Sequence, residues 1–559
     1  VYMLAGIEFL PLELTYRAWF RNAPIVTKFG LTEELPNWWV PPVGSPIFEQ
    51  RTLFHPDWLI PIFLMVMWTF LSSIGNIALG FVARELYMEV EELPFPIEEV
   101  DAVAVVSLTG EERRPIRILS VFAIAGFLWG SLVYAMPFVL QAWTGQMVQL
   151  VPIPWIDMNQ QVEGVFPGAS FGLATDIIPY TTGLVIPFSV ATSMMIGSLA
   201  IYFFGNWITV SQGIGPRWWL PGMKIDLAAQ QSILYFWAPI TIGLTLAAGV
   251  GPLLRRPRSL IRAFSSLANP FARRGKRRSD PVPGKAVILT LILSLGGGTA
   301  VFMILAPDFV FANLWILPFM VGMPFVTTII GGRIRGETGV KVKAKELQVE
   351  ELQKIMYLMS GYPKVDVWFA PNPMTKQGAG WLSTLKVAQL TETKASSAVK
   401  AYLLLLPFTV VIGLLYVQLL WRMAPIPSGR YPGAQIFWPI RATYDSLWIR
   451  GQQAGMFNVQ WIFSSLAVGT GVYFALDFAH GFLPLSYIGI AAGVGQLPPI
   501  PMAIFIGGIT SKVLARKFGE RWRSLSRLVA AGLAMGESIA ITVSVALSLI
   551  VNSIWILPI

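Results

Sequence analysis

A single carboxylate lies well inside a hydrophobic run near the end of the sequence. Glu537 follows Gly536 within Ser524 to Ile559. A carboxylate inside a lipid bilayer is costly unless it is paired or hydrated, so such a residue is a candidate for function by default. Glu537 could couple transport to an ion gradient or bind substrate. Alternatively, it could only form a structural hydrogen bond to a facing helix.

Other charged residues are candidates for binding or coupling. Asp477 and His480 lie about one helical turn apart near the end of an apolar run, where they could form a proton relay or mark the membrane interface. Glu98 and Glu99 follow two closely spaced prolines, so they either line a cavity beside freed carbonyls or lie in an aqueous loop. Lys386, Gln389 and Glu392 recur at spacings of three and six residues on one helical face, which either lines a vestibule or is a solvated amphipathic face.

The composition places these residues in an integral membrane protein. Of 559 residues, 54% are hydrophobic and only 13% are charged, about half the charged fraction of a soluble globular chain. The length suits one bundle of about ten or more spans of roughly 20 residues each. The chain has no Cys and two His, so we expect neither a metal site nor a redox cofactor. It also lacks the GxxxxGK[ST] loop that binds ATP phosphates.

The excess of basic residues indicates topology rather than nucleic-acid binding. The formal net charge is +10, and the Lys and Arg residues gather in loops. Residues 254–285 hold ten basic residues and one acidic residue, and residues 512–527 hold six and one. Because cytoplasmic loops carry such an excess, both loops are expected in the cytoplasm.

Two long stretches cannot be simple spans. Ile177 to Pro216 and Phe478 to Ser511 each exceed 30 residues without Asp, Glu, Lys or Arg, and Gly and Pro interrupt both. A straight span uses only about 20 residues. Each stretch must therefore break into two short pieces, or into a re-entrant loop and a span.

The two broken stretches also resemble each other. Pro187 to Gly197 and Pro498 to Gly508 have the same spacing of ten residues. This similarity arises either by chance between apolar helices or from a duplicated chain, and paired broken helices point to a transporter binding site. We expect the breaks to face each other across a central cavity, because unpaired carbonyls must face protein or water. The predicted break residues are Pro187, Pro498, Pro499 and Pro501, and the neighbouring binding candidates are Tyr180, Tyr487 and Gln496.

These observations predict an all-α polytopic bundle with an internal repeat. Residues 1–56 form an apolar piece and a Pro/Trp-rich loop, and residues 57–254 form the first half of the repeat. Residues 255–285 form the basic cytoplasmic loop. Residues 286–559 form the second half, which includes an amphipathic cytoplasmic segment at 337–364.

Several motifs in this order resemble the oligopeptide transporter (OPT) family. The segment Glu91-Glu-Leu-Pro-Phe-Pro-Ile97 is similar to the family's Leu-Pro-Phe-Pro segment after a span. Ser360 to Ala370, followed by Lys386 to Lys394, resembles its central loop. The two broken stretches and Ala531-Gly-Leu-Ala-Met-Gly-Glu537 resemble its Gly/Pro helices and terminal helix. The chain resembles a divergent archaeal or bacterial-type member, with fewer spans than the family's usual sixteen or so.

The resemblance implies a multi-pass carrier of the plasma membrane. Its implied activity is proton-coupled symport of oligopeptides or of metal complexes with peptide-like chelators, and the carrier could form homo-oligomers. Two alternatives come from other classes. An integral membrane transferase acting on lipid-linked substrates would need clustered acids, and no DxD or DDxxD motif occurs. A non-transporting subunit of a larger complex would lack paired broken helices.

Overall fold

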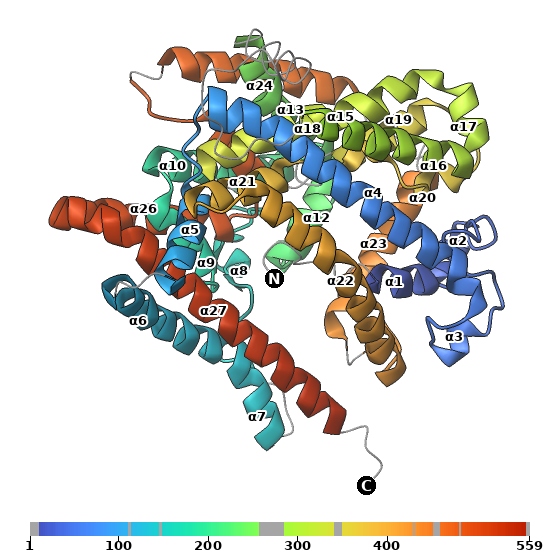
Figure 1. Cartoon of the computed structure of the whole chain (residues 1–559), viewed down its shortest axis with the longest axis horizontal. Helices are drawn as coiled ribbons and strands as arrows, with labels where there is room; N and C mark the ends of the chain where they lie inside the picture. Colours follow the sequence, from blue (N-terminus) through green and yellow to red (C-terminus); the bar gives the residue numbers. More distant parts are fainter. Residues whose placement is uncertain are drawn as a thin grey trace.

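The computed structural model describes residues 11–109, 113–144, 148–255, 284–339, 349–428, 431–450, 459–479 and 482–554. This part of the chain is almost entirely helical, which confirms the predicted all-α fold (Figure 1). The described residues contain one small sheet, in which β1 (Trp155–Asp157) pairs antiparallel with β2 (Gly172–Ala174).

The apolar, charge-free runs form the helices of the first half. π-helical turns of five to seven residues join several of them into longer rods, for example Ser131–Ala135 between α6 and α7. The helices are α4 (Leu59–Arg84), α5 (Pro96–Thr109), α6 (Arg113–Gly130), α7 (Met136–Thr144), α8 (Asn159–Val162), α9 (Ile178–Val185), α10 (Phe188–Ser198), α11 (Asn206–Ser211), α12 (Ile225–Ser232) and α13 (Ala238–Arg255).

The second half repeats this pattern of long apolar helices and short connectors. Its helices are α15 (Gly284–Leu291), α16 (Gly297–Leu305), α17 (Pro307–Ala312), α18 (Leu317–Thr338), α19 (Val349–Met359), α20 (Asp366–Phe369), α21 (Ala379–Leu390), α22 (Ala395–Met423), α23 (Pro432–Arg450), α24 (Val459–Phe478), α25 (Tyr487–Val494), α26 (Pro499–Phe518) and α27 (Glu520–Ile554).

Eight helices in the described residues are long and apolar enough to cross a membrane. Their exposed surfaces are rich in Leu, Ile, Val and Phe, as lipid-facing surfaces are. These candidate spans are Pro56–Glu89, Arg114–Gln141, Phe188–Ser211, Gly284–Leu305, Leu314–Glu337, Ala395–Met423, Gln460–Phe478 and Glu520–Leu547. The chain is therefore a multi-pass membrane protein.

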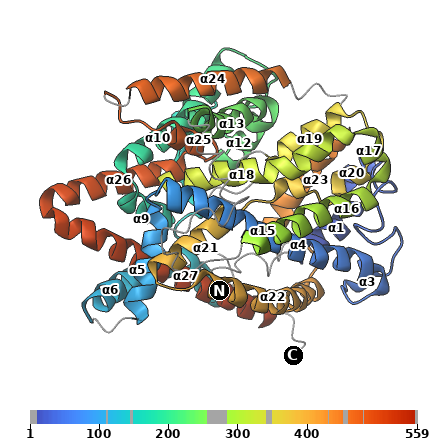
Figure 2. The same ribbon diagram turned by 45° about the horizontal axis from the view of Figure 1, so that its top comes forward.

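Short helices interrupt the predicted Pro/Trp-rich loop near the start of the chain. They are α1 (Leu12–Arg21), α2 (Pro24–Lys28) and α3 (Ile47–Gln50). Their apolar side chains form a core together with Trp421 of α22 and Trp438 of α23. This N-terminal region thus packs on the side of the bundle where α4 begins and α22 ends (Figure 2).

Two connecting segments are described only in part. Most of the basic loop at 255–285 lies outside the described residues, so its cytoplasmic position stays a prediction. The segment at 337–364 contains α19, whose apolar face is buried through Val349, Ile355 and Met356. Gly361 follows this helix with φ of +65°, as expected of a C-terminal glycine cap. The sidedness of the segment also stays a prediction.

Both long uncharged stretches are broken where Gly and Pro predicted. The helix α9 ends at Val185, and α10 begins after Pro187. The helix α25 ends at Val494, and α26 begins after Pro498. The prediction is wrong for Pro499 and Pro501, which lie in the first turn of α26. Proline is tolerated there because the first amides of a helix have no partner within it.

The two broken helix pairs pack directly on each other. The helix α9 lies against α26, and α10 lies against α25. A methyl group on Gly183 would lie 2.0 Å from the carbonyl oxygen of Ile504, and one on Gly493 would lie 2.0 Å from that of Met194. Glycine is therefore required at both contacts, where backbones touch. The equivalence of the two contacts is the arrangement that a duplicated chain would give, and the internal repeat stays a prediction.

The expectation that the breaks face each other across a central cavity is wrong. The first break lies beside Gly508, because a methyl group there would be 3.2 Å from the Phe188 ring. The second break lies beside Ser198, whose hydroxyl donates to the Gln496 carbonyl at 2.6 Å. Phe188 and Ser198 are ten residues apart on α10, which corresponds to about 15 Å of helix. Direct helix packing thus places the breaks at opposite ends of the contact.

Candidate functional site

Glu537 lies on α27 where this helix packs closely against α6 (Figure 1). A methyl group on Gly536 would lie 1.9 Å from the Ala123 carbonyl oxygen, so the small residues of α27 let the two backbones meet. The Glu537 side chain is fully buried.

The carboxylate of Glu537 binds the N-terminus of the half-helix α9. It accepts hydrogen bonds from the backbone amides of Ile177 at 2.9 Å and Ile178 at 3.1 Å. The first amides of a helix have no partner within it, and this end carries partial positive charge. A negatively charged side chain is stabilised at this position. The contact joins the last helix of the second half to the broken helix of the first.

A second carboxylate, which the sequence analysis missed, stands beside Glu537. Asp176 lies two residues before the first residue of α9, close enough for its charge to act on Glu537. One buried Asp176 oxygen, Oδ1, has no hydrogen-bond partner among the described residues. Burial raises the pKa of Asp176. Two nearby carboxylates favour the binding of one proton between them. Asp176 was overlooked because it lies at the edge of the uncharged stretch that begins at Ile177, and not within an apolar run.

The residues predicted near the breaks mostly hold the backbone in place. The Tyr180 hydroxyl donates to the Ala174 carbonyl at 2.9 Å, and the Tyr487 hydroxyl donates to the Leu244 carbonyl at 2.8 Å. Gln496 lies in the second break, and its buried Oε1 has no partner among the described residues. Substrate binding by these residues stays a prediction.

Glu98 and Glu99 lie in the helix α5, so the aqueous-loop interpretation is wrong. Glu98 is 1% exposed, accepts a bond from the Ser383 hydroxyl, and pairs with Arg335 at 2.8 Å. Glu99 pairs with Arg527 at 2.6 Å. The two acids therefore tie α5 to α18, α21 and the start of α27.

Asp477 forms an ion pair with Arg255, which joins the ends of α24 and α13. His480 lies outside the described residues, so the relay stays a prediction. Lys386 of α21 lies 3.5 Å from Gln389 Oε1 and 5.6 Å from the Phe95 ring centre. The helix ends at Leu390, before Glu392, so the predicted polar face is only two residues long.

A buried lysine is the second residue that the sequence analysis missed. Lys376 is 1% exposed, and its amine donates to the carbonyl and hydroxyl oxygens of Ser294, both at 2.8 Å. The amine also lies 4.7 Å from the Trp68 ring centre. It has no acidic partner among the described residues. Lys376 belongs to the connection between two spans, and burial lowers the pKa of its amine to about 7.

Comparison with known proteins agrees with the sequence resemblance. The family model of the OPT oligopeptide transporter protein matches residues 40–548, which is nearly the whole chain. No curated protein is significantly similar to the chain. The family match favours a transporter over the transferase and subunit alternatives.

Proposed function

The chain belongs to the OPT oligopeptide transporter family, and we propose that it imports oligopeptides, or peptide-like metal chelates, in symport with protons across the plasma membrane. In this proposal Glu537 carries the coupling proton. The supporting observation is the contact of its buried carboxylate with the N-terminus of α9. Asp176 assists by favouring the protonated form of the pair.

Protonation of Glu537 would weaken its hold on α9. A hydrogen bond to a charged group contributes about 1.5–3 kcal/mol, which is roughly twice the contribution of a neutral one. Loss of the charge also removes the attraction to the positive end of the helix, worth about 0.3–1 kcal/mol. A few kcal/mol is enough to shift a two-state equilibrium, since about 1.4 kcal/mol corresponds to a tenfold change.

A proton gradient can supply energy of this size. One charge moving through 100 mV gains about 2.3 kcal/mol. The proton would enter at Glu537 and loosen the contact between α27 and α9. Because α9 packs on α26, this change would let α27 move relative to the pair of helices α9 and α26.

The test is uptake of a labelled tripeptide by proteoliposomes with an acidic exterior. Wild-type protein should accumulate the peptide against its gradient. Glu537→Gln should retain peptide exchange and lose this accumulation. The matched control is Glu163→Gln, since Glu163 also accepts a backbone amide, that of Gly222 at 2.9 Å, but in an exposed loop. Accumulation by Glu537→Gln at the wild-type level would refute the role of Glu537.

A further inference from the structure

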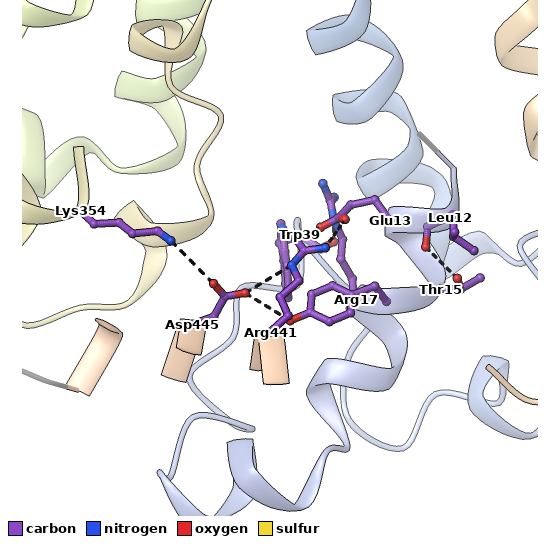
Figure 3. Close-up of polar contacts among 9 residues, drawn as sticks. Leu12, Glu13, Thr15, Arg17, Trp39, Lys354, Arg441 and Asp445 are labelled. Atoms are coloured by element: carbon purple, nitrogen blue, oxygen red, sulfur yellow. Dashed lines mark hydrogen bonds and ion pairs between the residues drawn. The ribbon is translucent and has the colours of Figure 1, made fainter. Parts of the chain in front are cut away.

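A cavity of about 290 Å³ lies between α1, α19 and α23, and Glu537 is not among its lining residues. Figure 3 shows the polar contacts of Glu13, Lys354, Arg441 and Asp445, which line it. The residues that define this charged cavity are Glu13, Tyr16, Glu350, Lys354, Arg441 and Asp445. Its volume is at the lower end of ligand pockets, which hold roughly 300–1,000 Å³. The cavity therefore suits a small ligand.

The amphipathic pattern of α19 explains one wall of the charged cavity. Its apolar face is buried in the bundle, as described above. Its polar face recurs at i, i+3, i+4 and i+7, and all four of these side chains line the cavity: Glu350, Gln353, Lys354 and Tyr357. The polar face of this helix thus lines the cavity, which is open to solvent at Arg441, whose side chain is 48% exposed.

The opposite wall is a fixed ion pair. Arg441 of α23 binds Glu13 of α1 through two bonds of 2.8 Å, and its guanidinium lies 3.9 Å from the Tyr16 ring centre. Such two-bonded pairs are strong and orient both partners. Arg441 and Glu13 therefore hold each other in a defined orientation at this wall of the cavity.

The Asp445 carboxylate makes longer polar contacts than the Arg441–Glu13 pair does. It accepts a hydrogen bond from the Tyr16 hydroxyl at 3.2 Å. Among the described residues, Asp445 pairs with two cationic atoms, Arg441 Nε at 3.6 Å and Lys354 Nζ at 3.9 Å, both beyond hydrogen-bond distance. Burial, and then Asp445 itself, raise the pKa of Tyr16, so its hydroxyl keeps its proton and orients the carboxylate. A carboxylate has about four lone-pair sites, so Asp445 retains capacity for a ligand.

The lining charges and rings suit a zwitterion. Three carboxylates and two cations face the cavity, and the rings of Trp39, Trp368 and Trp448 complete its walls. Aromatic rings near an acidic group favour a bound ammonium. Lys354 Nζ also lies 5.5 Å from the Trp448 ring centre. Because a lysine is a compact charge on a flexible stem, it can exchange its contact with Asp445 for a new anionic partner.

We infer that the charged cavity binds a short peptide by its two charged ends. The amino terminus binds Asp445, and Lys354, released from Asp445, binds the terminal carboxylate. The loose Lys354–Asp445 pair is thus exchanged for two pairs with the ligand. Residues of an extended peptide advance by about 3.3–3.6 Å each, so the first and third residues of a tripeptide lie roughly 7 Å apart. Lys354 Nζ lies 3.9 Å from Asp445, so the lysine side chain must swing away from Asp445 to reach the far end of the peptide. The inference takes its substrate class from the proposed function and adds the binding site.

Calorimetry on the full-length protein in nanodiscs tests this site with three probes. They are trialanine, N-acetyl-trialanine and trialanine amide. Wild-type protein should bind trialanine at least about tenfold more tightly than either blocked form, since each loses one charge-assisted contact. Failure to bind trialanine, or equal affinity for all three peptides, would overturn the inference.

Two variants separate recognition from folding. Asp445→Asn should weaken binding of trialanine and its amide about tenfold without changing that of the N-acetyl form. Lys354→Met should weaken binding of trialanine and the N-acetyl form without changing that of the amide. Arg450→Gln is the control, because Arg450 lies on α23 but pairs with Glu34 outside the cavity. Equal losses for all three peptides would show a structural role and overturn the site.

The outcome is independent of proton coupling. Selective binding by charged ends, without uptake under a proton gradient, would uphold the cavity and refute the proposed symport. Proton-coupled uptake of peptide without selective binding by the charged ends would uphold the symport and overturn the binding site in the cavity.

Discussion

Replacing Lys376 by methionine should change how stability depends on pH. The amine has an ordinary pKa of 10.5, lowered to about 7 by burial in the fold. Between these values the unfolded chain binds a proton at this site and the folded chain does not. Folding stability should therefore rise with pH across this window, by up to about 1.4 kcal/mol per pH unit. Below pH 7 both states are protonated, and this dependence ends.

The measurement is the free energy of unfolding by denaturant in detergent micelles at pH 7, 8 and 9. We compare wild type with Lys376→Met, so that the other titrating groups cancel. From pH 7 to 9 the wild type should gain up to about 3 kcal/mol relative to the variant. The exposed-lysine variant Lys394→Met should follow the wild type. Parallel pH profiles for wild type and Lys376→Met would refute this reasoning.

Two further substitutions test the packing of the bundle. Gly493→Ala would place a methyl group 2.0 Å from the Met194 carbonyl oxygen and should destabilise the fold by about 1–3 kcal/mol in thermal or chemical unfolding. The control is Gly380→Ala, whose methyl group would enter open space and should not destabilise the fold. Equal stability of the two variants would contradict the close contact at Gly493. Arg335→Met leaves Glu98 buried without its cation and should cost about 3–5 kcal/mol, whereas adding Glu98→Gln should recover much of this loss. A double variant as unstable as the single one would argue against the ion pair.

Local sequence features predicted the helices and their breaks well. Charge-free runs located the spans, and the prolines and glycines near 187 and 498 located the interruptions, because both effects act within one segment. The position of the breaks relative to each other was not predictable in this way. It depends on α9 packing against α26 and α10 against α25, a contact between segments about 300 residues apart.

The same difference between local sequence features and tertiary contacts separates the candidate residues that the sequence predicted from those that it did not. Glu537 stood out because a carboxylate in an apolar run is costly wherever the run folds. Lys376 lies in a polar connection, and only the tertiary fold buries it beside Ser294. Asp445 and Lys354 come from separate helices, and no sequence pattern brings them together. Burial of a charged residue, and contact between charged residues of separate helices, depend on the tertiary fold and leave no local signal.

Proton movement driven by peptide tests the central claim most directly. Proteoliposomes containing a pH-sensitive dye are prepared without a pH gradient, and trialanine is added outside. Symport predicts that the lumen acidifies with wild-type protein, and that Glu537→Gln exchanges peptide without acidification. Peptide entry into wild-type liposomes with no change of internal pH would contradict proton coupling.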